Sequence, residues 1–316
     1  MRKKYRERFL DPEVSKKIEV LENAPDTKSR LERVRTSLKS KVTEPFYIGA
    51  IGVFISIVAF LFFNEYAIIP IFFIWQFCSK YIKKSRTDIA DLYVEHFLKP
   101  VLTEILPDTE VDYFGRIDLK ILSNLVRDSE KYYSNCHIIF GDDYRTEFCN
   151  LESYHYTTDK DDHEVRHTDF TGQVLCAKFE TNISGHIRVV PVYKKGIFGI
   201  NHWPYGNKRK YENEIQTESI EFNNSYSIFS TDDFYTRLIL DANIIELLNN
   251  MKKNMDVAIY MNEKYISVAF ESKHFLFTAP HTKNFVDKLS LAGEYEKVRT
   301  KLADFYALID IIGEKF

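Results

Sequence analysis

Most short signatures of known chemistry are missing from this sequence of 316 residues. It has no G-x-x-x-x-G-K-S/T phosphate loop, no G-x-S-x-G nucleophile elbow and no EF-hand spacing. The letters H-E-x-x-H occur once, at residues 163–167, but there the context is a loop entering a strand and not the helix that this zinc motif needs. The absent motifs exclude the motif-based nucleotide, acyl-transfer and calcium sites, and neither a catalytic residue nor a cofactor is predicted. Internal repeats and low-complexity segments are also absent, which excludes a repeat architecture.

Cysteine is scarce, with four residues and no C-x-x-C pair. Cys78 lies in an apolar run, and Cys136, Cys149 and Cys176 are scattered through the rest of the chain. The three cysteines outside the apolar run cannot all pair with one another in disulfide bonds. Free thiols in a reducing compartment are therefore predicted. Cys149 and Cys176 alternate with apolar residues, a pattern typical of a strand core rather than of catalysis.

Charge is absent from Phe46 to Phe63, a run of eighteen residues with eleven Ile, Val, Leu or Phe side chains between Ile48 and Phe63. As a helix the run would be about 27 Å long, close to the hydrocarbon thickness of a bilayer. A second uncharged run, Tyr66–Ser79, is shorter and extends to Ile82 if Lys80 directs its ammonium group outward. We therefore predict two transmembrane helices.

The predicted helices, about residues 46–63 and 66–82, form a transmembrane helical hairpin over 46–82 that turns at Asn64-Glu65. A single helix over the whole stretch would be too long for a bilayer even with tilt. The alternative is a buried hairpin in a globular core, which the length of the first uncharged run disfavours. A cleavable signal peptide is not predicted, because the apolar run starts far from Met1.

Lysine and arginine flank both apolar runs and are absent between them. The flanking residues are Arg33, Arg35, Lys39, Lys41, Lys80, Lys83, Lys84 and Arg86. The positive-inside rule then predicts a multi-pass membrane protein with both termini in the cytoplasm. Both ends would still share one face of the bilayer if the hairpin only dipped into it.

Charge is divided unevenly along the chain. Residues 1–86 hold 17 Lys/Arg and 9 Asp/Glu, a net charge of +8, and the remaining residues hold 26 and 37, a net charge of −11. The basic part suits anionic head groups, so a lipid bilayer is the first predicted partner. The acidic part argues against nucleic acid as a partner, because phosphate binding requires a basic face.

The N-terminal segment, residues 1–45, is predicted to be a basic cytosolic region with an amphipathic helix. Residues 1–25 are polar and contain proline breaks, which predicts partial disorder. Over 26–42, apolar residues recur at steps of three and four, and this helix lies either on the membrane surface or against the soluble domain. Residues 83–106 are predicted to form a connector helix that kinks or breaks at Pro100.

The remaining residues, 107–316, are predicted to form a cytosolic α+β domain with mainly antiparallel strands and packed helices. Its predicted strands, which turn-forming stretches separate, are 136–140, 144–158, 171–180, 186–194, 257–261, 265–272 and 274–280. Its predicted helices are 117–126, 232–248 and 295–312.

Three passages of this domain resemble one known family. They are GDDYRTEFCNLESYHYTT (141–158) with TDFTGQVLCAKFE (168–180), TESIEFNNSYSIFSTDDFYTRLILDANIIELL (217–248) and YISVAFESKHFLF (265–277). On these residues the chain, over roughly 40–316, is similar to the bacterial membrane-protein family catalogued as domain of unknown function 3137. The resemblance implies an N-terminal membrane hairpin and a cytosolic domain, in a bacterial inner membrane, and implies no activity. The insert from His202 to Tyr211 has no place in the family pattern.

The middle passage, 217–248, has a physical interpretation of its own. A strand ending at Phe222, a turn at 223–225 and a strand beginning near Tyr226 would be followed by a helix that Thr231 or Asp232 caps. Its prominent residues are therefore predicted to form a packing unit rather than a catalytic one.

Histidine and aspartate gather in HYTTDKDDHEVRHTDF, residues 155–170. The candidate metal ligands in this stretch are His163, His167 and Asp169, with Asp159, Asp161 and Asp162 nearby. In a strand, residues four apart lie about 13 Å apart, too far to share one zinc ion without a tight bend. A solvated hairpin tip is therefore predicted, and no metal site.

A basic loop with aromatic residues, KKGIFGINHWPYGNKRK, covers residues 194–210. Its candidate residues for anionic lipid are Lys194, Lys195, Trp203, Lys208, Arg209 and Lys210. On a membrane-tethered domain, lipid is a nearer source of phosphate than single-stranded nucleic acid. An ordinary surface loop is the alternative.

The sequence thus favours a membrane-anchored, non-enzymatic interaction or scaffold module that recruits a protein partner. The alternative is a membrane-tethered enzyme with an unfamiliar active site, built around His163, His167 or the loop at His202. A channel is disfavoured, because uncharged spans offer no ion path unless several copies assemble. Homo-oligomerisation is left open.

Overall fold

A computed structural model describes residues 5–196 and 199–315 of the chain. It contains two compact units. The first, here called the sheet unit, comprises residues 1–14, 105–277 and 297–316. The second, the helical unit, comprises residues 15–104 and 278–296.

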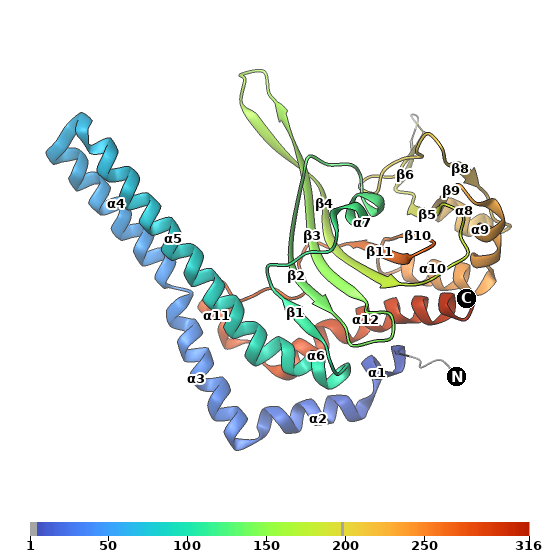
Figure 1. Cartoon of the computed structure of the whole chain (residues 1–316), viewed down its shortest axis with the longest axis horizontal. Helices are drawn as coiled ribbons and strands as arrows, with labels where there is room; N and C mark the ends of the chain where they lie inside the picture. The colour runs from blue at the N-terminus through green and yellow to red at the C-terminus, as the bar shows by residue number, and fades with distance from the viewer. Residues whose placement is uncertain (1–4, 197–198, 316) are drawn as a thin grey trace. The chain divides into compact units, whose positions relative to one another are not determined.

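The sheet unit contains a nine-stranded sheet in the order β1-β2-β3-β4-β11-β10-β5-β9-β8 (Figure 1). The strands are β1 Glu110–Asp112, β2 Lys131–Ile139, β3 Glu147–Thr158, β4 Glu164–Lys178, β5 His186–Pro191, β8 Asn213–Ile215, β9 Tyr226–Ser230, β10 Val257–Asn262 and β11 Tyr265–Glu271. Every neighbouring pair is antiparallel. A separate ribbon pairs β6 (Lys194–Gly196) with β7 (Gly199–Asn201). The predicted α+β class with mainly antiparallel strands is therefore confirmed.

Successive side chains of a strand point to opposite faces of the sheet, and β-branched and aromatic residues lie on both faces. Both faces are therefore covered by other elements. One face packs against α7 (Leu119–Leu125), where Leu122 and Leu125 meet Val174, Phe229 and other buried side chains. The opposite face meets α10 (Ala242–Lys252), since the Tyr226 hydroxyl donates a hydrogen bond to the Leu248 carbonyl oxygen. Burial on two sides explains why β10 and β11 are mostly apolar.

Short helices in this unit begin at side-chain caps. They are α7, α8 (Ile220–Ser225), α9 (Asp233–Ile239) and α10, and their capping residues are Asp118, Ser219, Asp232 and Asp241. The predicted cap at Asp232 is confirmed, and its carboxylate accepts a hydrogen bond from the Tyr235 N–H at 3.1 Å. The single helix predicted over 232–248 is wrong, because α9 ends at Ile239 and Asp241 caps a new helix, α10.

The predicted disorder of residues 1–25 is wrong for the part that the structure describes. Helix α1 (Arg6–Leu10) places Phe9 within the sheet unit, where its ring stacks on Tyr306 of α12 (Leu291–Gly313) at 4.9 Å. The Asp143 N–H also donates a hydrogen bond to the Tyr5 hydroxyl. The buried rings of Tyr5 and Phe9 thus anchor the start of the chain to the sheet unit.

Two predicted strands are absent. The strand expected to end at Phe222 is the helix α8, which Ser219 caps. Residues 274–280 are irregular, because β4 and β10 already occupy both sides of β11 and leave no free edge there. Instead, the Leu276 N–H donates to the Asn150 side chain, and the buried Phe277 ring meets Phe148 edge-on.

The long strands β3 and β4 extend past their neighbours (Figure 1). Pairing with β2 ends at Tyr154, and pairing of β4 with β11 ends at Gly172. Residues 155–167, here called the arm, therefore pair only with each other. A stack of His155 on His167, with ring centroids 5.4 Å apart, stabilises its base.

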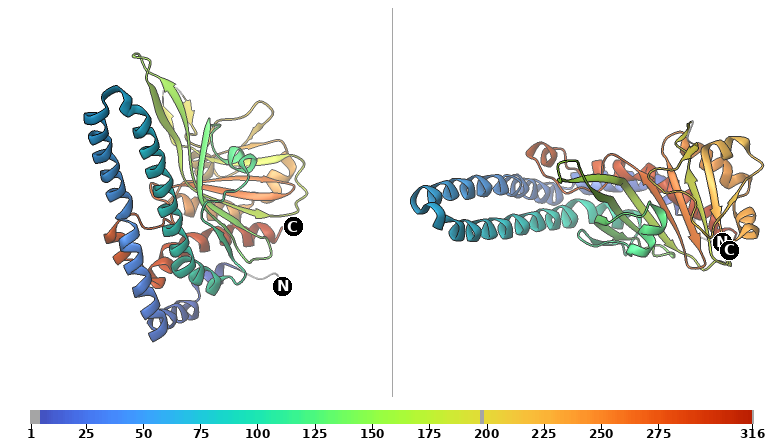
Figure 2. Two further views of the ribbon diagram at one scale, coloured as in Figure 1. Left: turned by 60° about the vertical axis from the view of Figure 1, so that its left-hand side comes forward. Right: turned by 90° about the horizontal axis from the view of Figure 1, so that it is seen from above.

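The helical unit consists of α-helices, a 3₁₀ turn and a π-helical turn. Its elements are α2 Pro12–Asn23 from Ser15 onward, α3 Pro25–Lys41, α4 Glu44–Phe63, η1 Asn64–Ala67, α5 Ile68–Tyr93, η2 Val94–Leu98, α6 Lys99–Ile105, α11 Lys283–Asp287 and the start of α12. After the 3₁₀ turn η1 the chain reverses, and α5 packs along α4 (Figure 2). Their contact is close at Gly52, where an added Cβ atom would lie 2.9 Å from Cys78 Sγ.

Helix α3 buries its apolar stripe inside the helical unit. Leu31, Val34 and Leu38 are buried, and Arg35 donates hydrogen bonds to the Leu289 carbonyl oxygen at 2.6 and 3.0 Å. Of the two interpretations left open by the sequence, packing against protein is therefore the one that the structure supports for this stripe.

Pro100 does not break the connector helix. The π-helical turn η2 precedes it, and α6 continues beyond it. Proline lacks an N–H and its ring crowds the carbonyl four residues earlier, so a locally widened turn relieves the clash without ending the helix.

Candidate functional site

Helices α4 and α5 carry more than half of the large hydrophobic side chains that are exposed in the described chain. Phe54 is 67% exposed, Phe62 is 80% exposed and Ile68 is 73% exposed. A buried helix pair in a globular core, the alternative to membrane insertion, is inconsistent with this exposure. Apolar surface of this extent marks contact with lipid or protein.

By length and composition, the described chain has one helical stretch suited to crossing a membrane, Pro25–Phe63, and only 11% of its most apolar window is buried. Helix α5 does not meet the same test, because its uncharged part is short and lysines follow from Lys80. One candidate span near the N-terminus is thus what the structure shows.

The basic residues that flank the apolar runs divide into two groups. Arg33, Lys80, Lys83, Lys84 and Arg86 are exposed. By contrast, Arg35 binds the Leu289 carbonyl, Lys39 pairs with Asp287 at 2.5 Å, and Lys41 pairs with Asp88 at 2.7 Å. The second group therefore serves packing within the helical unit, whereas the first presents free positive charge.

The candidate metal ligands lie in the arm and its base. His163 and His167 are exposed, and the Thr157 hydroxyl lies 2.7 Å from His167 Nε2. Asp169 is buried and accepts hydrogen bonds from Ser129 Oγ and His155 Nδ1, both at 2.8 Å. Within the described residues, no three His, Cys, Asp or Glu side chains are grouped to hold a metal ion.

The basic loop is partly committed to protein contacts. The Arg209 guanidinium donates hydrogen bonds to Asn124 Oδ1 and the Ser123 carbonyl oxygen, and Arg127 lies 4.6 Å over the Trp203 ring. Lys208 and Lys210 are exposed. Lys194 and Lys195 belong to β6, and their side chains lie outside the described part of the structure.

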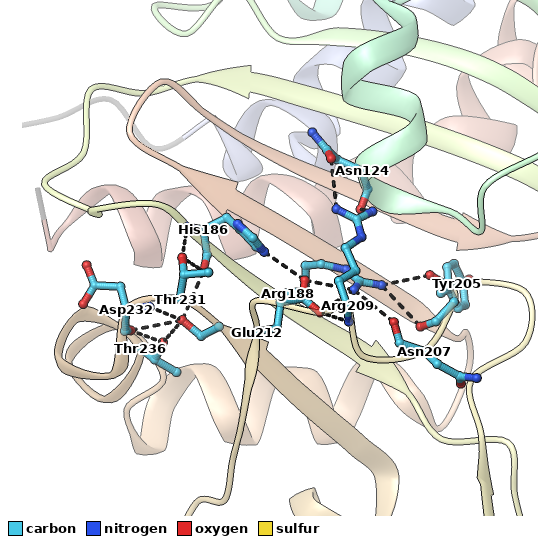
Figure 3. A network of polar contacts seen from close by, with 12 residues as sticks. Asn124, His186, Arg188, Tyr205, Asn207, Arg209, Glu212, Thr231, Asp232 and Thr236 are labelled. Carbon is cyan, nitrogen blue, oxygen red and sulfur yellow. Dashed lines mark hydrogen bonds and ion pairs between the residues drawn. The ribbon is translucent and has the colours of Figure 1, made fainter.

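A buried ion pair organises this loop (Figure 3). Arg188, which is 2% exposed, sits in the middle of β5 and pairs with Glu212 through Nη1 at 2.9 Å. Its remaining donors meet the carbonyl oxygens of Tyr205, Gly206 and Asn207 at 3.1 to 3.3 Å. The loop thus wraps around one guanidinium group.

The partners of this ion pair are also satisfied. Glu212 accepts further hydrogen bonds from His186 Nε2 at 2.8 Å and from the Arg209 N–H at 2.6 Å. Gly206 has φ of +85°, a conformation that a residue with a Cβ atom adopts only with strain. His202 is buried between Asn207 and Ser227, and burial lowers its pKa.

Acid is expected to weaken this network. Burial alone would raise the pKa of the Glu212 carboxyl, but hydrogen bonds from His186, Arg209 and Arg188 outweigh it and lower the pKa to about 2, below the ordinary 4.5. A depressed carboxyl pKa stabilises the fold above pH 4.5, and this stabilisation, roughly 3 kcal/mol, is lost as the pH falls toward 2. Thermal unfolding followed by circular dichroism across this range checks it.

The control for this prediction is Glu212→Gln, which cannot titrate. Its melting temperature at pH 7 should be lower than that of the unaltered chain, and its further loss between pH 4.5 and 2 should be smaller. Equal acid sensitivity of the two proteins would show that other carboxylates dominate the acid response.

A groove of about 620 Å³ lies in the sheet unit between the end of β8 and the helices α8, α9 and α10. Its apolar lining includes Ile215, Ile228, Leu240 and Ile245. Glu218, Glu221 and Glu246 line it as well, and these side chains are exposed. In the described part of the chain, none of the three carboxylates forms a hydrogen bond or an ion pair through its side chain.

Several other polar groups of the groove already have partners, and one buried oxygen does not. Asp241 pairs with Lys315 at 2.6 Å, Arg237 with Asp233 at 3.3 Å, and Lys253 Nζ donates to Asn250 Oδ1 at 2.8 Å. Asn249 Oδ1 is inaccessible to solvent and has no hydrogen-bond donor among the described residues. The described lining contains no histidine or cysteine.

Sequence reasoning missed both the ion pair and the groove. Arg188 could have been noticed as a charged residue at an inward position of an apolar strand, HIRVVP. The groove depends on the break between α9 and α10, and its only signal was the aspartate at position 241. Of the predicted sites, the arm brings His167 and Asp169 near His155 but leaves His163 at the exposed tip.

Comparisons with known proteins give one structural likeness and one family. No curated protein matches the sequence. Among solved structures, the crystal structure of the mycobacterial trehalose monomycolate transport factor A, TtfA, is similar over 64% of this chain and 88% of that chain, with 8% sequence identity and a TM-score of 0.36. A likeness at this TM-score carries no argument about fold or function.

A family profile gives the firmer result. The profile described as "Protein of unknown function (DUF3137)" matches residues 168–314, which include β5, the Arg188 network and the whole lining of the groove. Residues 168–314 of this chain therefore form a domain of the DUF3137 family.

Proposed function

We propose that this protein is a membrane-anchored interaction module whose folded sheet unit recruits a protein partner at the membrane surface. The observation that carries the proposal is the exposure of apolar side chains along α4, such as Phe54 and Phe62. Water is a poor solvent for such a surface, whereas a bilayer accepts it at no cost.

The proposal includes α5 as a second span, so that the two helices form a transmembrane hairpin. Ile68, Phe72 and Phe77 are 63% to 73% exposed, which supports lipid contact along this helix too. Close packing at Gly52 and Cys78 supports joint insertion, since small residues let membrane helices approach. The first span then helps the shorter second one to insert.

Orientation follows from the free cations at the open end of the helix pair. Exposed cations flank the two apolar runs in the sequence, and the turn at η1 carries no lysine or arginine. These cations are Arg33, Lys80, Lys83, Lys84 and Arg86. The positive-inside rule then places both termini in the cytoplasm of a bacterial inner membrane. Lys208 and Lys210 offer a further contact for anionic head groups.

Interaction is favoured over catalysis by the chemistry of the groove. Its described lining offers carboxylates and amides but neither histidine nor cysteine, and His202 is buried in a structural network instead. A site of this kind recognises a partner through charge and shape. A carboxylate that acts as a general base is normally tuned by burial and by charged neighbours, whereas Glu218, Glu221 and Glu246 are exposed and without partners in the described part of the chain.

Affinity capture of the full chain in lipid nanodiscs tests the proposal. We expect a defined protein to be recovered with the intact chain and lost with a chain truncated after residue 106. A fluorescent reporter fused after the last residue should also be active in the cytoplasm. Recovery of background alone in repeated captures, or reporter activity only in the periplasm, would refute the proposal.

A further inference from the structure

We infer that the groove between β8 and helices α8, α9 and α10 binds a basic amphipathic peptide segment of the partner protein. This inference rests on the proposed function and specifies the surface and the chemistry of recruitment. The groove lies within residues 215–253, inside the part of the chain that the DUF3137 profile matches.

The charge of the groove selects a cationic ligand. Glu218, Glu221 and Glu246 present three exposed carboxylates without partners in the described part of the chain. The two cations of the lining, Arg237 and Lys253, already contact Asp233 and Asn250. Unpaired carboxylates around a groove attract lysine or arginine and disfavour acidic segments.

The apolar floor of the groove and one hydrogen-bond acceptor without a donor set two further requirements for the ligand. Ile215, Ile228 and Leu240 are buried beneath the groove and favour an aliphatic side chain above them. Asn249 lines the groove, and its Oδ1 is an acceptor without a donor, which costs free energy. Because this atom is closed to solvent, a ligand N–H reaches it only when the side chain turns toward the groove. A ligand with donors, positive charge and apolar groups satisfies all three features.

A peptide fits better than a small amine because apolar exposure continues outside the groove. The helices α8 and α9 that wall it also expose Ile220, Phe234 and Leu238, at 78%, 71% and 48%. A helix laid along these elements would cover such side chains with its apolar face and direct its basic residues to the rim. A small amine would leave them in water.

The test uses the full chain in nanodiscs of zwitterionic lipid, with empty nanodiscs as the blank. The probe is a fluorescein-labelled amphipathic helical peptide of leucine and lysine, and fluorescence anisotropy measures its Kd at low salt. The groove variant carries Glu218→Gln, Glu221→Gln and Glu246→Gln. We expect its Kd to rise about tenfold or more, and the binding of the unaltered chain to weaken with added salt.

A matched variant removes the same number of charges elsewhere in the sheet unit. It carries Asp161→Asn, Glu164→Gln and Glu180→Gln, three exposed positions outside the groove. Its Kd should stay within about twofold of that of the unaltered chain. A photo-crosslinking form of the peptide should label the fragment that contains residues 215–253. Equal effects of the two variants, or labelling elsewhere, would overturn the inference.

Four further outcomes separate the possibilities. Equal binding of a leucine and glutamate peptide would overturn the charge argument, and full competition by spermidine would assign the groove to a small amine instead. If the groove variant still captures the protein partner of the unaltered chain, the inference is wrong and the proposed function stands. If the unaltered chain binds the basic peptide but captures no partner, the proposed function fails while the groove chemistry holds.

Discussion

Replacing Arg188 by alanine should lower the free energy of unfolding by roughly 3–5 kcal/mol, because it leaves the Glu212 carboxylate buried without its main cation. The carbonyl oxygens of Tyr205, Gly206 and Asn207 lose their donors in the same step. For a domain of this size we expect a fall in melting temperature of roughly 6–20 °C. Circular dichroism of the purified chain in detergent measures it.

Two variants calibrate this result. Arg145→Ala also breaks an arginine–carboxylate contact of 2.7 Å, but its partner Glu110 is exposed, so the loss should stay below about 1 kcal/mol. The double variant Arg188→Met/Glu212→Leu removes both charges and should recover part of the stability. Equal melting temperatures for Arg188→Ala and Arg145→Ala would show that the buried pair contributes little.

Placing arginine at Phe54 and Ile57 should release the protein from the membrane. Both side chains lie near the middle of α4 and are 67% and 55% exposed. Each arginine costs about 2.5–3.5 kcal/mol at the centre of a spanning helix, so the pair costs roughly 5–7 kcal/mol. Carbonate extraction of membranes, followed by immunoblotting, should find most of the variant in the soluble fraction and the unaltered chain in the pellet.

The matched control places arginine at Ile220 and Phe234, which are similarly exposed but belong to the sheet unit. That variant should remain in the pellet. A third variant, Phe72→Arg/Phe73→Arg, examines the proposed second span on α5 and should also weaken membrane retention. Retention of the α4 variant in the pellet would contradict membrane anchoring through this helix.

The features that sequence reasoning predicted correctly are those that depend on neighbours along the chain. The uncharged run from Phe46 to Phe63, the strands flanking the turn at Asn262 and the cap at Asp232 all leave local patterns that physical rules interpret directly. Antiparallel pairing of successive strands such as β3 and β4 follows for the same reason.

The candidate site was harder, because its parts meet only in the folded chain. Arg188 and Glu212 are separated by 24 residues and by the ribbon of β6 and β7, and no pattern marks them as partners. The groove requires the stop at Leu240, yet the letters around it, LILDANIIELL, fit one continuous apolar helix. Neither the pairing of distant charges nor a cavity between helices has a local signature.

The inner and outer parts of β3 and β4 differ in how many neighbouring strands pair with them. Up to the pair of Leu151 and Gly172 each strand has another strand on its far side, whereas the four pairs from His155–His167 to Thr158–Glu164 have no other strand beside them. Those outer pairs can fray and close again while the inner register stays locked. The same two strands are thus rigid where they belong to the sheet and more mobile in the arm. A protease would cut the arm long before the core of the sheet unit opens.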